Sequence, residues 1–344
     1  MKTIGSHIYT HSTAFITENG STLPGLQLAY ETWGSFNAEK SNVILICHAL
    51  TGHANAKEWF SGLFSKDGIL STDDYLVLCI NVPGSCYGST GPASIHPETG
   101  KKYGNQFPVL TIRDFVRAQQ LILDALQITE VQLAIGGSMG GMQALEFALM
   151  DKRIKSAAVL AAGARHEAWA IGISEAQRYA IYADPKWKNG DYDEQPKDGL
   201  AAARMMAMVT YRSQKQYNER FKRNIQDDDR FEVASYLQYQ GRKLAERFDA
   251  NSYIRLTQAM DSHDVGRDRG GIDRALSACN IPVLIVGIDS DLLYPTDEQK
   301  LLAEHLPKGV YKEISSPYGH DAFLIEFEKL NQILKSFINT EIPV

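Results

Sequence analysis

The chain has 344 residues, a length that suits about two domains of roughly 150 residues each or one elaborated domain. Hydrophobic residues make up 44% and charged residues 22%, which excludes intrinsic disorder as a description of the whole chain. The net charge of −6 argues against a nucleic-acid-binding protein, and no apolar run approaches the roughly 18 residues that a membrane-spanning helix needs.

Strand-like and helix-like segments alternate in the first half of the chain. The predicted strands are residues 26–33, 42–48, 75–81, 131–136 and 156–162, most of them nearly all apolar. Such runs are typical of strands that are buried on both faces. Apolar residues at helical spacing predict a helix over residues 111–126. The alternation predicts an α/β fold with a mostly parallel sheet flanked by helices.

From residue 164 the pattern becomes helical. Helices are predicted over residues 165–183, 200–213, 217–224 and 231–261, with a loop over 184–198. Buried-strand patterns return at 281–286 and 310–314, and an amphipathic helix over 322–338 closes the chain. We therefore expect a core domain of residues 1–163 and 272–344, interrupted by a helical cap, or lid, of residues 164–271.

A candidate nucleophile lies at the end of the strand predicted over 131–136. The run Gly136-Gly137-Ser138-Met139-Gly140 fits G-x-S-x-G and precedes a helix predicted over 142–150. A strand, a sharp turn and a helix are the context of a nucleophile elbow, in which the serine oxygen projects above the sheet. Flanking glycines let backbone segments approach without Cβ clashes. A glycine-rich turn with an incidental serine is the alternative, which this context disfavours.

A serine hydroxyl needs a base to become a nucleophile. In folds that carry such a nucleophile elbow, the chain order of the catalytic residues is Ser, then Asp or Glu, then His. Of the nine histidines, His320 is the only one in a loop after the last predicted strand. His48, His53 and His263 precede any plausible acid, so we expect structural roles for them.

Two aspartates follow the strand predicted over 281–286, and both qualify as the acid. Asp291 is favoured because the acid of this fold usually stands four residues before a proline, here Pro295. Asp289 remains the alternative. A buried aspartate at this place would hold the tautomer of the imidazole and stabilise the imidazolium formed during attack.

An oxyanion hole needs two backbone donors. The N–H of Met139 is one candidate, and the N–H of Leu50, in the loop after the strand predicted over 42–48, is the other. Two such donors can contribute on the order of 3 kcal/mol each to the transition state.

Several longer segments carry a family resemblance. They are CHALTG (47–52), GSTGPASIHPETGKKYGNQFP (88–108), TIRDFV (111–116), GGSMGGMQALEFA (136–148), LQYQGRKLAERFDANSY (237–253), MDSHDVGR (260–267), GIDSDLLYP (287–295) and YGHDAF (318–323). With these segments the chain resembles the homoserine O-acetyltransferases, acyl-CoA-dependent enzymes of methionine biosynthesis with the α/β-hydrolase fold. The cap segment is the more telling part, since other hydrolases share the elbow but not this insertion.

The resemblance implies a catalytic triad of Ser138, Asp291 and His320. It also implies a set of substrate-binding residues: Arg204 for the homoserine α-carboxylate, Asp321 for its ammonium, and Tyr211 and Thr51 as further contacts. A guanidinium can take a carboxylate as a bidentate pair. The alternatives are a surface arginine on an amphipathic cap helix and an N-cap aspartate for the closing helix.

The function implied is acetyl transfer from acetyl-CoA to the hydroxyl of L-homoserine by a ping-pong mechanism. Homoserine O-succinyltransferase, serine O-acyltransferase and ester or thioester hydrolase are the alternatives. Kinship also implies a homodimer formed through the cap. Acetyl-CoA is then a co-substrate, and we expect no cofactor. We also expect no metal, since no cluster of His, Asp or Glu residues has the spacing of metal ligands. A cytoplasmic protein is expected, because the N-terminus lacks an apolar signal segment and the four cysteines are widely spaced.

Overall fold

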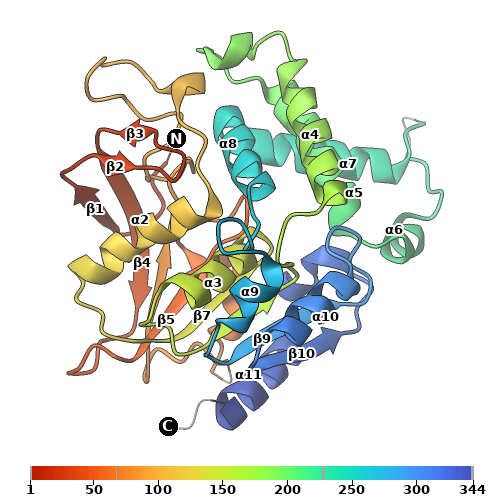
Figure 1. The fold of residues 1–344 in the computed structure, drawn as a ribbon. Coiled ribbons are helices and arrows are strands. Elements are labelled where there is room, and N and C mark those ends of the chain that lie inside the picture. Colours follow the sequence, from red (N-terminus) through yellow and green to blue (C-terminus); the bar gives the residue numbers. More distant parts are fainter. Residues whose placement is uncertain (1, 67, 227–228, 342–344) are drawn as a thin grey trace.

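The computed structural model describes residues 2–66, 68–226 and 229–341 (Figure 1). Within them an eight-stranded sheet has the order β1-β4-β6-β5-β7-β8-β9-β10. Its strands are β1 His7–His11, β4 Leu26–Trp33, β5 Val43–Cys47, β6 Leu76–Ile80, β7 Val131–Gly137, β8 Ala157–Leu160, β9 Val283–Ile288 and β10 Gly309–Ile314. All the predicted strands are confirmed. The edge strand β1 and the small hairpin of β2 (Phe15–Ile16) and β3 (Thr22–Leu23) were not predicted.

The sheet is parallel from β6 to β10, whereas β4 runs antiparallel to β6 and β1 antiparallel to β4. Strand β5 lies between β6 and β7, so the strand order reverses beside β5. In open α/β sheets, ligands bind in the crevice outside the carboxyl ends of the strands at such a switch point. The loops after β5 and β7 therefore meet where a ligand site is expected.

Helices cover both faces of the sheet. One face packs against α2 (Ile112–Ala125), α3 (Met139–Met150), α9 (Ile272–Ser277) and α10 (Thr296–His305). The other packs against α1 (Ala56–Trp59) and α11 (Phe327–Glu341). Alternate residues of a strand enter opposite layers: Leu45 lies in the first core, and Ile44 and Ile46 lie in the second. Two buried layers explain why these strands are apolar throughout.

Between β8 and α9 the structure is helical, as predicted. The helices there are α4 Ala168–Tyr182, α5 Lys197–Tyr211, α6 Gln214–Phe221, α7 Glu232–Ala245 and α8 Ala250–Asp261, and Figure 1 shows them beyond one end of the sheet. The helical stretch 231–261 is two helices, because Asp249 accepts a hydrogen bond from the N–H of Ser252 (2.8 Å) and begins α8. The division into core and cap domains at residues 164 and 271 stays a prediction.

The helix predicted over 322–338 begins too early. Residues Gly319–Leu324 form a 3-10 helix, η4, and α11 begins only at Phe327. Amphipathic periodicity cannot separate a 3-10 turn from the helix that follows it, because both carry apolar residues at similar spacing. The turn matters here because it carries His320 and Asp321.

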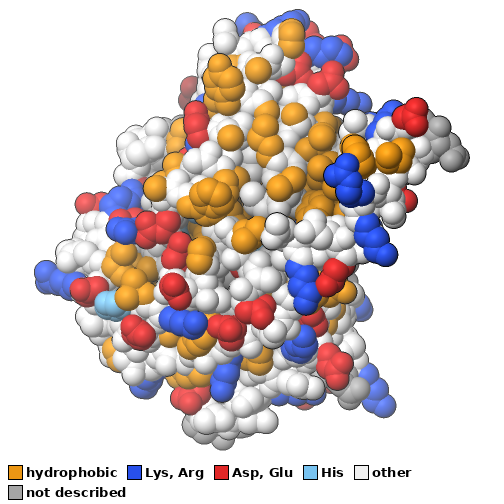
Figure 2. Space-filling model, turned by 90° about the vertical axis from the view of Figure 1, so that its right-hand side faces the viewer, with side chains coloured by type: hydrophobic (Ala, Val, Ile, Leu, Met, Phe, Trp, Pro, Cys, Tyr) orange, Lys and Arg blue, Asp and Glu red, His pale blue; other side chains and the backbone are white. Residues whose placement is uncertain are grey.

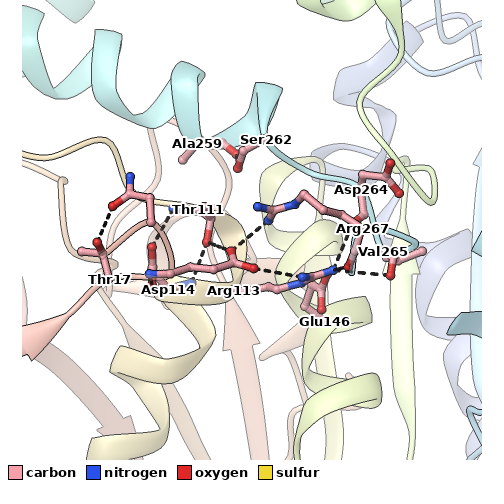
Figure 3. A network of polar contacts seen from close by, with 12 residues as sticks. Thr17, Thr111, Arg113, Asp114, Glu146, Ala259, Ser262, Asp264, Val265 and Arg267 are labelled. Carbon is pink, nitrogen blue, oxygen red and sulfur yellow. Dashed lines mark hydrogen bonds and ion pairs between the residues drawn. The ribbon is translucent and has the colours of Figure 1, made fainter. Parts of the chain in front are cut away.

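An ion-pair network fixes the segment that returns from α8 to the core (Figure 3). Arg113 of α2 pairs with Glu18 (2.9 Å) and with Glu146 of α3 (3.2 Å). Its guanidinium also donates to the backbone carbonyls of Asp264 (3.1 Å) and Arg267 (2.7 Å). Glu146 is 1% exposed, so the pairing is buried. The outgoing and returning segments are also joined to each other, since a backbone bridge links 165 with 264.

No helix in the described ranges is long and apolar enough to cross a membrane. The four cysteines, Cys47, Cys79, Cys86 and Cys279, are free thiols buried in the core. Burial raises the pKa of Cys86 to about 12, which keeps that thiol protonated near neutral pH.

Candidate active site

Ser138 occupies a strained turn between β7 and α3. Its φ of 57° and ψ of −126° lie in a region that L-residues rarely adopt. The backbone N–H of Ser138 donates to the carbonyl of Leu160 on β8 (2.9 Å), and its own carbonyl accepts from Met142 (3.1 Å). These bonds hold the serine at the carboxyl end of the sheet with 6% of its surface exposed. The geometry is that of a nucleophile elbow.

Two glycines make the elbow possible. A Cβ on Gly140 would lie 2.1 Å from the carbonyl oxygen of Cys47, at the end of β5. A Cβ on Gly136 would lie 2.3 Å from the carbonyl oxygen of Gly140. Both distances are far below a van der Waals contact, so only glycine fits. The first turn of α3 is therefore packed directly on the end of β5 and on the loop that carries Leu50.

His320 and Asp291 form a buried pair. His320 Nδ1 donates to Asp291 Oδ2 over 2.7 Å. The other carboxylate oxygen, Oδ1, accepts from the backbone N–H groups of Leu293 (2.8 Å) and Tyr294 (3.0 Å). Burial by itself would lower the pKa of His320, but the Asp291 carboxylate outweighs it, and the pKa is raised above its ordinary value.

Asp289 points elsewhere. Its carboxylate accepts from the hydroxyl of Ser315 (2.6 Å) and from the N–H of Ser316 (3.0 Å). It therefore ties the loop after β9 to the loop after β10. Of the two aspartates left open by the sequence, Asp291 is the one that contacts His320.

Gly137, the residue before Ser138, and His320 both lie against the ring of Phe323. A Cβ on Gly137 would lie 2.4 Å from the ring of Phe323, and this ring makes an edge contact with the His320 imidazole at 5.5 Å between centroids. Among the hydrogen bonds of the described residues, none joins the Ser138 hydroxyl to His320. In structures without substrate such bonds are often long and tighten only in the reacting complex. Phe323 thus connects the elbow that carries Ser138 to the buried pair of His320 and Asp291.

The two predicted oxyanion donors are held near each other by Gln143. Its side-chain amide donates to the carbonyl of His48 (3.2 Å), two residues before Leu50, and to the carbonyl of Met139 (3.0 Å). Leu50 and Met139 are both buried, and neither N–H has an acceptor within the described part of the chain. Unused donors at a helix start and in an adjacent loop are what an oxyanion hole requires.

Two of the other histidines, His48 and His263, are engaged with the backbone. His48 Nδ1 lies 2.9 Å from the carbonyl of Ala49, and its Nε2 accepts from the N–H of Val82 (3.1 Å). Burial lowers the pKa of His48 to about 4, so the ring is neutral. His263 Nε2 lies 3.1 Å from the carbonyl of Gly163. Both positions fit structural roles. His53 is mostly buried, and its Nε2 lies 3.4 Å from a Glu58 oxygen.

Arg204 and Tyr211, both on α5, approach the imidazole from the cap. The guanidinium carbon of Arg204 lies 5.4 Å from the centroid of the Tyr211 ring, and that ring lies 5.5 Å from the His320 ring. Arg204 has no hydrogen bond or ion pair to any residue in the described ranges. A cation held by ring contact alone keeps its donors free for an anionic ligand.

Asp321 has a partner that the sequence did not suggest. Arg212, just after α5, pairs with it at 3.0 Å between Nε and Oδ2. Burial raises the pKa of Asp321, and Arg212 and Arg204 oppose this rise. No periodicity or motif marked Arg212, because the contact joins residues far apart in the chain. The N-cap alternative for Asp321 is wrong, since α11 begins at Phe327.

Thr51 links the loop after β5 to the cap. Its carbonyl accepts from Arg247 (3.1 Å), which lies between α7 and α8 and also donates to the hydroxyl of Tyr87. The backbone of Thr51 is thus committed within the protein, and its partly exposed side chain remains the part that a substrate can touch.

A large cavity lies away from this site. Its volume is about 860 Å³, and its lining includes Tyr103, Asn105, Asn189 and Asp249. None of the predicted catalytic or substrate-binding residues lines it. Within the described ranges, no cluster of three or more His, Cys, Asp or Glu side chains is arranged to hold a metal ion.

The profile of the alpha/beta hydrolase fold family matches residues 42–327. The chain therefore belongs to the α/β-hydrolase fold class, as the sheet and the elbow indicate. It is 51% identical over 337 residues to a homoserine O-acetyltransferase of Chlorobium chlorochromatii, covering 96% of this chain and 94% of that protein. The crystal structure of homoserine O-acetyltransferase from Bacillus anthracis superposes with a TM-score of 0.92 at 26% identity, covering 100% of both chains. The chain belongs to the homoserine O-acetyltransferase family.

The same fold also serves hydrolysis. The crystal structure of a mutant of esterase E22 superposes with a TM-score of 0.90 at 25% identity and covers 96% of this chain and 98% of that one. The overall fold therefore does not separate a transferase from an esterase, and the substrate-binding side chains have to do so.

Proposed function

We propose that this protein transfers the acetyl group of acetyl-CoA to the hydroxyl of L-homoserine through an acetyl-Ser138 intermediate. The observation that carries the proposal is the placement of Arg204. Its guanidinium has no anionic partner in the described ranges and stacks on Tyr211, which contacts the His320 ring. A free cation at this place suits an acceptor with a carboxylate, and the simple esters of a hydrolase do not require one.

The first half-reaction forms the acyl-enzyme. His320 Nε2 takes the proton of the Ser138 hydroxyl while Asp291 holds the imidazole through Nδ1. The serine oxygen attacks the thioester carbon, and the N–H groups of Leu50 and Met139 stabilise the oxyanion. The C–S bond breaks, and the imidazolium returns the proton to the departing thiolate. The products are acetyl-Ser138 and CoA.

The second half-reaction transfers the acetyl group to homoserine. Arg204 binds the α-carboxylate and Asp321 binds the ammonium, so the hydroxyl is directed at the acetyl carbon. Tyr211 and Thr51 are proposed as further substrate contacts. His320 removes the hydroxyl proton, the new C–O bond forms, and the bond to Ser138 breaks. The products are O-acetyl-L-homoserine and the free serine, and the step belongs to methionine biosynthesis.

Water competes for the acetyl-enzyme at far higher concentration than homoserine. Positioning can supply an effective molarity of order 10⁵ M or more, which is enough to favour an oriented hydroxyl. The cap supplies that orientation, since Arg204 and Tyr211 both lie on α5. We propose that no cofactor and no metal takes part, with acetyl-CoA and homoserine as the only substrates.

Steady-state kinetics test the mechanism directly. With acetyl-CoA and homoserine varied, parallel double-reciprocal lines and an acetyl adduct on Ser138 are expected. Ser138→Ala should abolish CoA release, whereas Ser277→Ala on the surface of α9 should not change it. Intersecting lines together with an active Ser138→Ala enzyme would refute the covalent mechanism.

A hydrolase is the second candidate, favoured by the esterase neighbour. Acetyl-CoA alone separates the two: rapid multiple turnover without an amino-acid acceptor indicates a hydrolase, and a single burst of CoA indicates a transferase. A panel of acetyl-CoA against succinyl-CoA, and of homoserine against serine, tests the remaining alternatives by thiol release. Acetyl-CoA with homoserine is the expected pair.

We also propose a homodimer that forms through the cap. Large apolar side chains are exposed on three adjacent cap helices: Trp169 and Tyr179 on α4, Met206 and Val209 on α5, and Tyr239 on α7. Figure 2 shows hydrophobic side chains gathered over the upper part of that face. Exposed apolar side chains gathered on one face mark a site of association. Sedimentation of the native protein tests it, and Tyr179→Lys should shift the protein toward the monomer. We propose a cytoplasmic location.

A further inference from the structure

A second buried histidine stands behind the catalytic pair. His166 lies on the segment between β8 and α4, where the chain first leaves the core. It is 4% exposed, and its Nδ1 lies 3.0 Å from the hydroxyl of Tyr294, whose side chain is fully buried. The mechanism proposed above uses neither residue. A hydrogen bond between two buried side chains so close to the catalytic pair calls for an explanation.

Tyr294 contacts both members of the catalytic pair. Its ring lies 5.3 Å from the ring of His320, with 38° between their planes. Its backbone N–H donates to Asp291 Oδ1 (3.0 Å), the carboxylate oxygen that does not hold the imidazole. The Tyr294 ring is therefore one of the aromatic rings, with Tyr211 and Phe323, that confine the His320 ring. The hydrogen bond to His166 is the only one the Tyr294 hydroxyl makes within the described ranges.

His166 is itself held by both chain segments that cross between core and cap. Its backbone N–H donates to the carbonyl of His263 on the returning segment (2.9 Å). Its Nε2 faces Oδ1 of Asp261, the last residue of α8, at 3.8 Å. The other oxygen of Asp261 pairs with Arg178 of α4 (2.7 Å). The ring thus lies where α4, α8 and the catalytic loop meet.

The ring of His166 is neutral. Burial lowers the pKa of His166 to about 3, with His263 and Arg178 adding to the effect. A neutral imidazole carries one proton, and the nearby Asp261 carboxylate favours that proton on Nε2. Nδ1 is then an acceptor, and the Tyr294 hydroxyl donates to it.

We propose that His166 and Tyr294 are positioning residues, which hold the His320 ring against Asp291 and connect the base of the cap to the catalytic pair. Neither touches the substrate. The His166 acceptor fixes the Tyr294 ring, and the ring confines the imidazole at the angle from which Nε2 reaches Ser138. The inference rests on the proposed function, because the two residues act through its base.

Three variants separate positioning from mere packing. His166→Leu removes the acceptor, and His166→Asn is of similar size but places an amide oxygen near the position of Nδ1. Tyr294→Phe keeps the ring and removes the donor. His305→Asn, at the surface end of α10, is the matched control for a lost imidazole.

The readouts are kcat, both KM values, the unfolding temperature and the rate at which a fluorophosphonate labels Ser138. His166→Leu and Tyr294→Phe should each lower kcat and the labelling rate by about 10-fold to 100-fold, with KM values within about twofold. His166→Asn should retain most of the activity. The double variant should be no slower than either single one, because the two residues form one unit.

Wild-type kcat and labelling in a folded His166→Leu enzyme would overturn the proposal. So would equal losses in His166→Leu and His166→Asn that follow the unfolding temperature. If His166→Leu does not fold, Tyr294→Phe decides alone, and unchanged labelling refutes the inference. Labelling needs neither natural substrate. A wild-type enzyme that labels rapidly but does not acetylate homoserine would therefore refute the proposed function and leave this inference to be judged by its own variants.

Discussion

One carboxylate oxygen of Asp291 accepts a hydrogen bond from His320, and the other accepts from the backbone of its own loop. Oδ2 lies 2.7 Å from Nδ1 of His320, and Oδ1 accepts from the N–H groups of Leu293 and Tyr294. The carboxylate cannot rotate without breaking these bonds, so the imidazole proton is held on Nδ1. Nε2 is then the basic nitrogen and is free to face the serine.

Replacing that carboxylate should cost most of the activity. Asp291→Asn keeps the volume but favours the wrong tautomer, and we expect kcat to fall by about 10⁴-fold, as such a change does in other triads. Asp289→Asn is the matched control and should lower kcat little, because within the described ranges the Asp289 carboxylate holds only Ser315 and Ser316. Equal losses in the two variants would contradict the assignment of the acid. Single-turnover CoA release measures both.

The pH dependence of acylation should report His320. Asp291 raises the pKa of this imidazole above its ordinary value of 6.5, although burial opposes the shift. The base must be neutral, so activity should fall as the pH drops through a value above about 6.5. The low-pH side, or acid limb, of the pH profile of kcat/KM for acetyl-CoA measures this pKa. In Asp291→Asn the residual activity should show this limb at lower pH, because the stabilising charge is gone. An unmoved limb would mean that another group titrates.

The local parts of this site could be predicted from the sequence. The glycines at 136 and 140 and the apolar run before Ser138 are consecutive in the chain, and the contacts that require them involve adjacent strands and one helix turn. The strands were equally clear, because a sheet buried on both faces leaves almost no polar residue in them. Edge strand β1 was missed since one side of it meets solvent and its pattern is mixed.

Contacts between distant segments could not be predicted. The pairs Arg212–Asp321 and His166–Tyr294 each join residues more than a hundred positions apart, and no periodicity marks them. Asp291 is the exception, since its spacing from Pro295 favoured it over Asp289 and the contact with His320 confirms that preference. Sequence spacing restricts which residues can meet only within one element or one turn.

Arg204 should affect the binding of the acyl acceptor, homoserine, and not the reaction with the acyl donor, acetyl-CoA. Arg204→Ala should raise the KM of homoserine by about 100-fold, the loss expected for a charge-assisted bidentate pair worth about 3 kcal/mol. The CoA burst with acetyl-CoA alone should persist, because the acylation step does not use this side chain. Arg204→Lys should restore part of the homoserine affinity, because the lysine ammonium keeps the positive charge but lacks the bidentate donor geometry of a guanidinium. Arg242→Ala, exposed on α7, serves as the control. A suppressed burst in Arg204→Ala would place the residue in the first half-reaction.

The ion pair between Arg212 and Asp321 should set the charge of the group that binds the substrate ammonium. Burial raises the pKa of Asp321, and Arg212 counteracts it at 3.0 Å. In Arg212→Gln that pKa should rise further, so less of the carboxylate is ionised near neutral pH. The KM of homoserine should increase, most strongly at low pH, and recover as the pH rises. Arg220→Gln, exposed on α6, should leave the KM unchanged. A KM increase that is independent of pH would instead indicate a lost structural contact.

The buried network around Arg113 should contribute to stability and not to chemistry. Arg113→Met leaves Glu18 and Glu146 without one partner and frees the carbonyls of the segment that returns from α8, although Arg269 still pairs with Glu146 (2.7 Å). Removing one partner of a buried ion pair typically costs about 3–5 kcal/mol of unfolding free energy.

Urea unfolding measures the loss, with Lys155→Met as the control. Lys155 pairs with Glu130 at the surface, and this substitution should cost less than about 1 kcal/mol. Below the unfolding transition the KM values of Arg113→Met should match the wild type. Arg267 and Arg269 still pair with Glu18 (2.8 Å) and Glu146 (2.7 Å) and keep the returning segment in place. A raised KM for homoserine in fully folded Arg113→Met would show that this anchor also sets the position of the cap over the site.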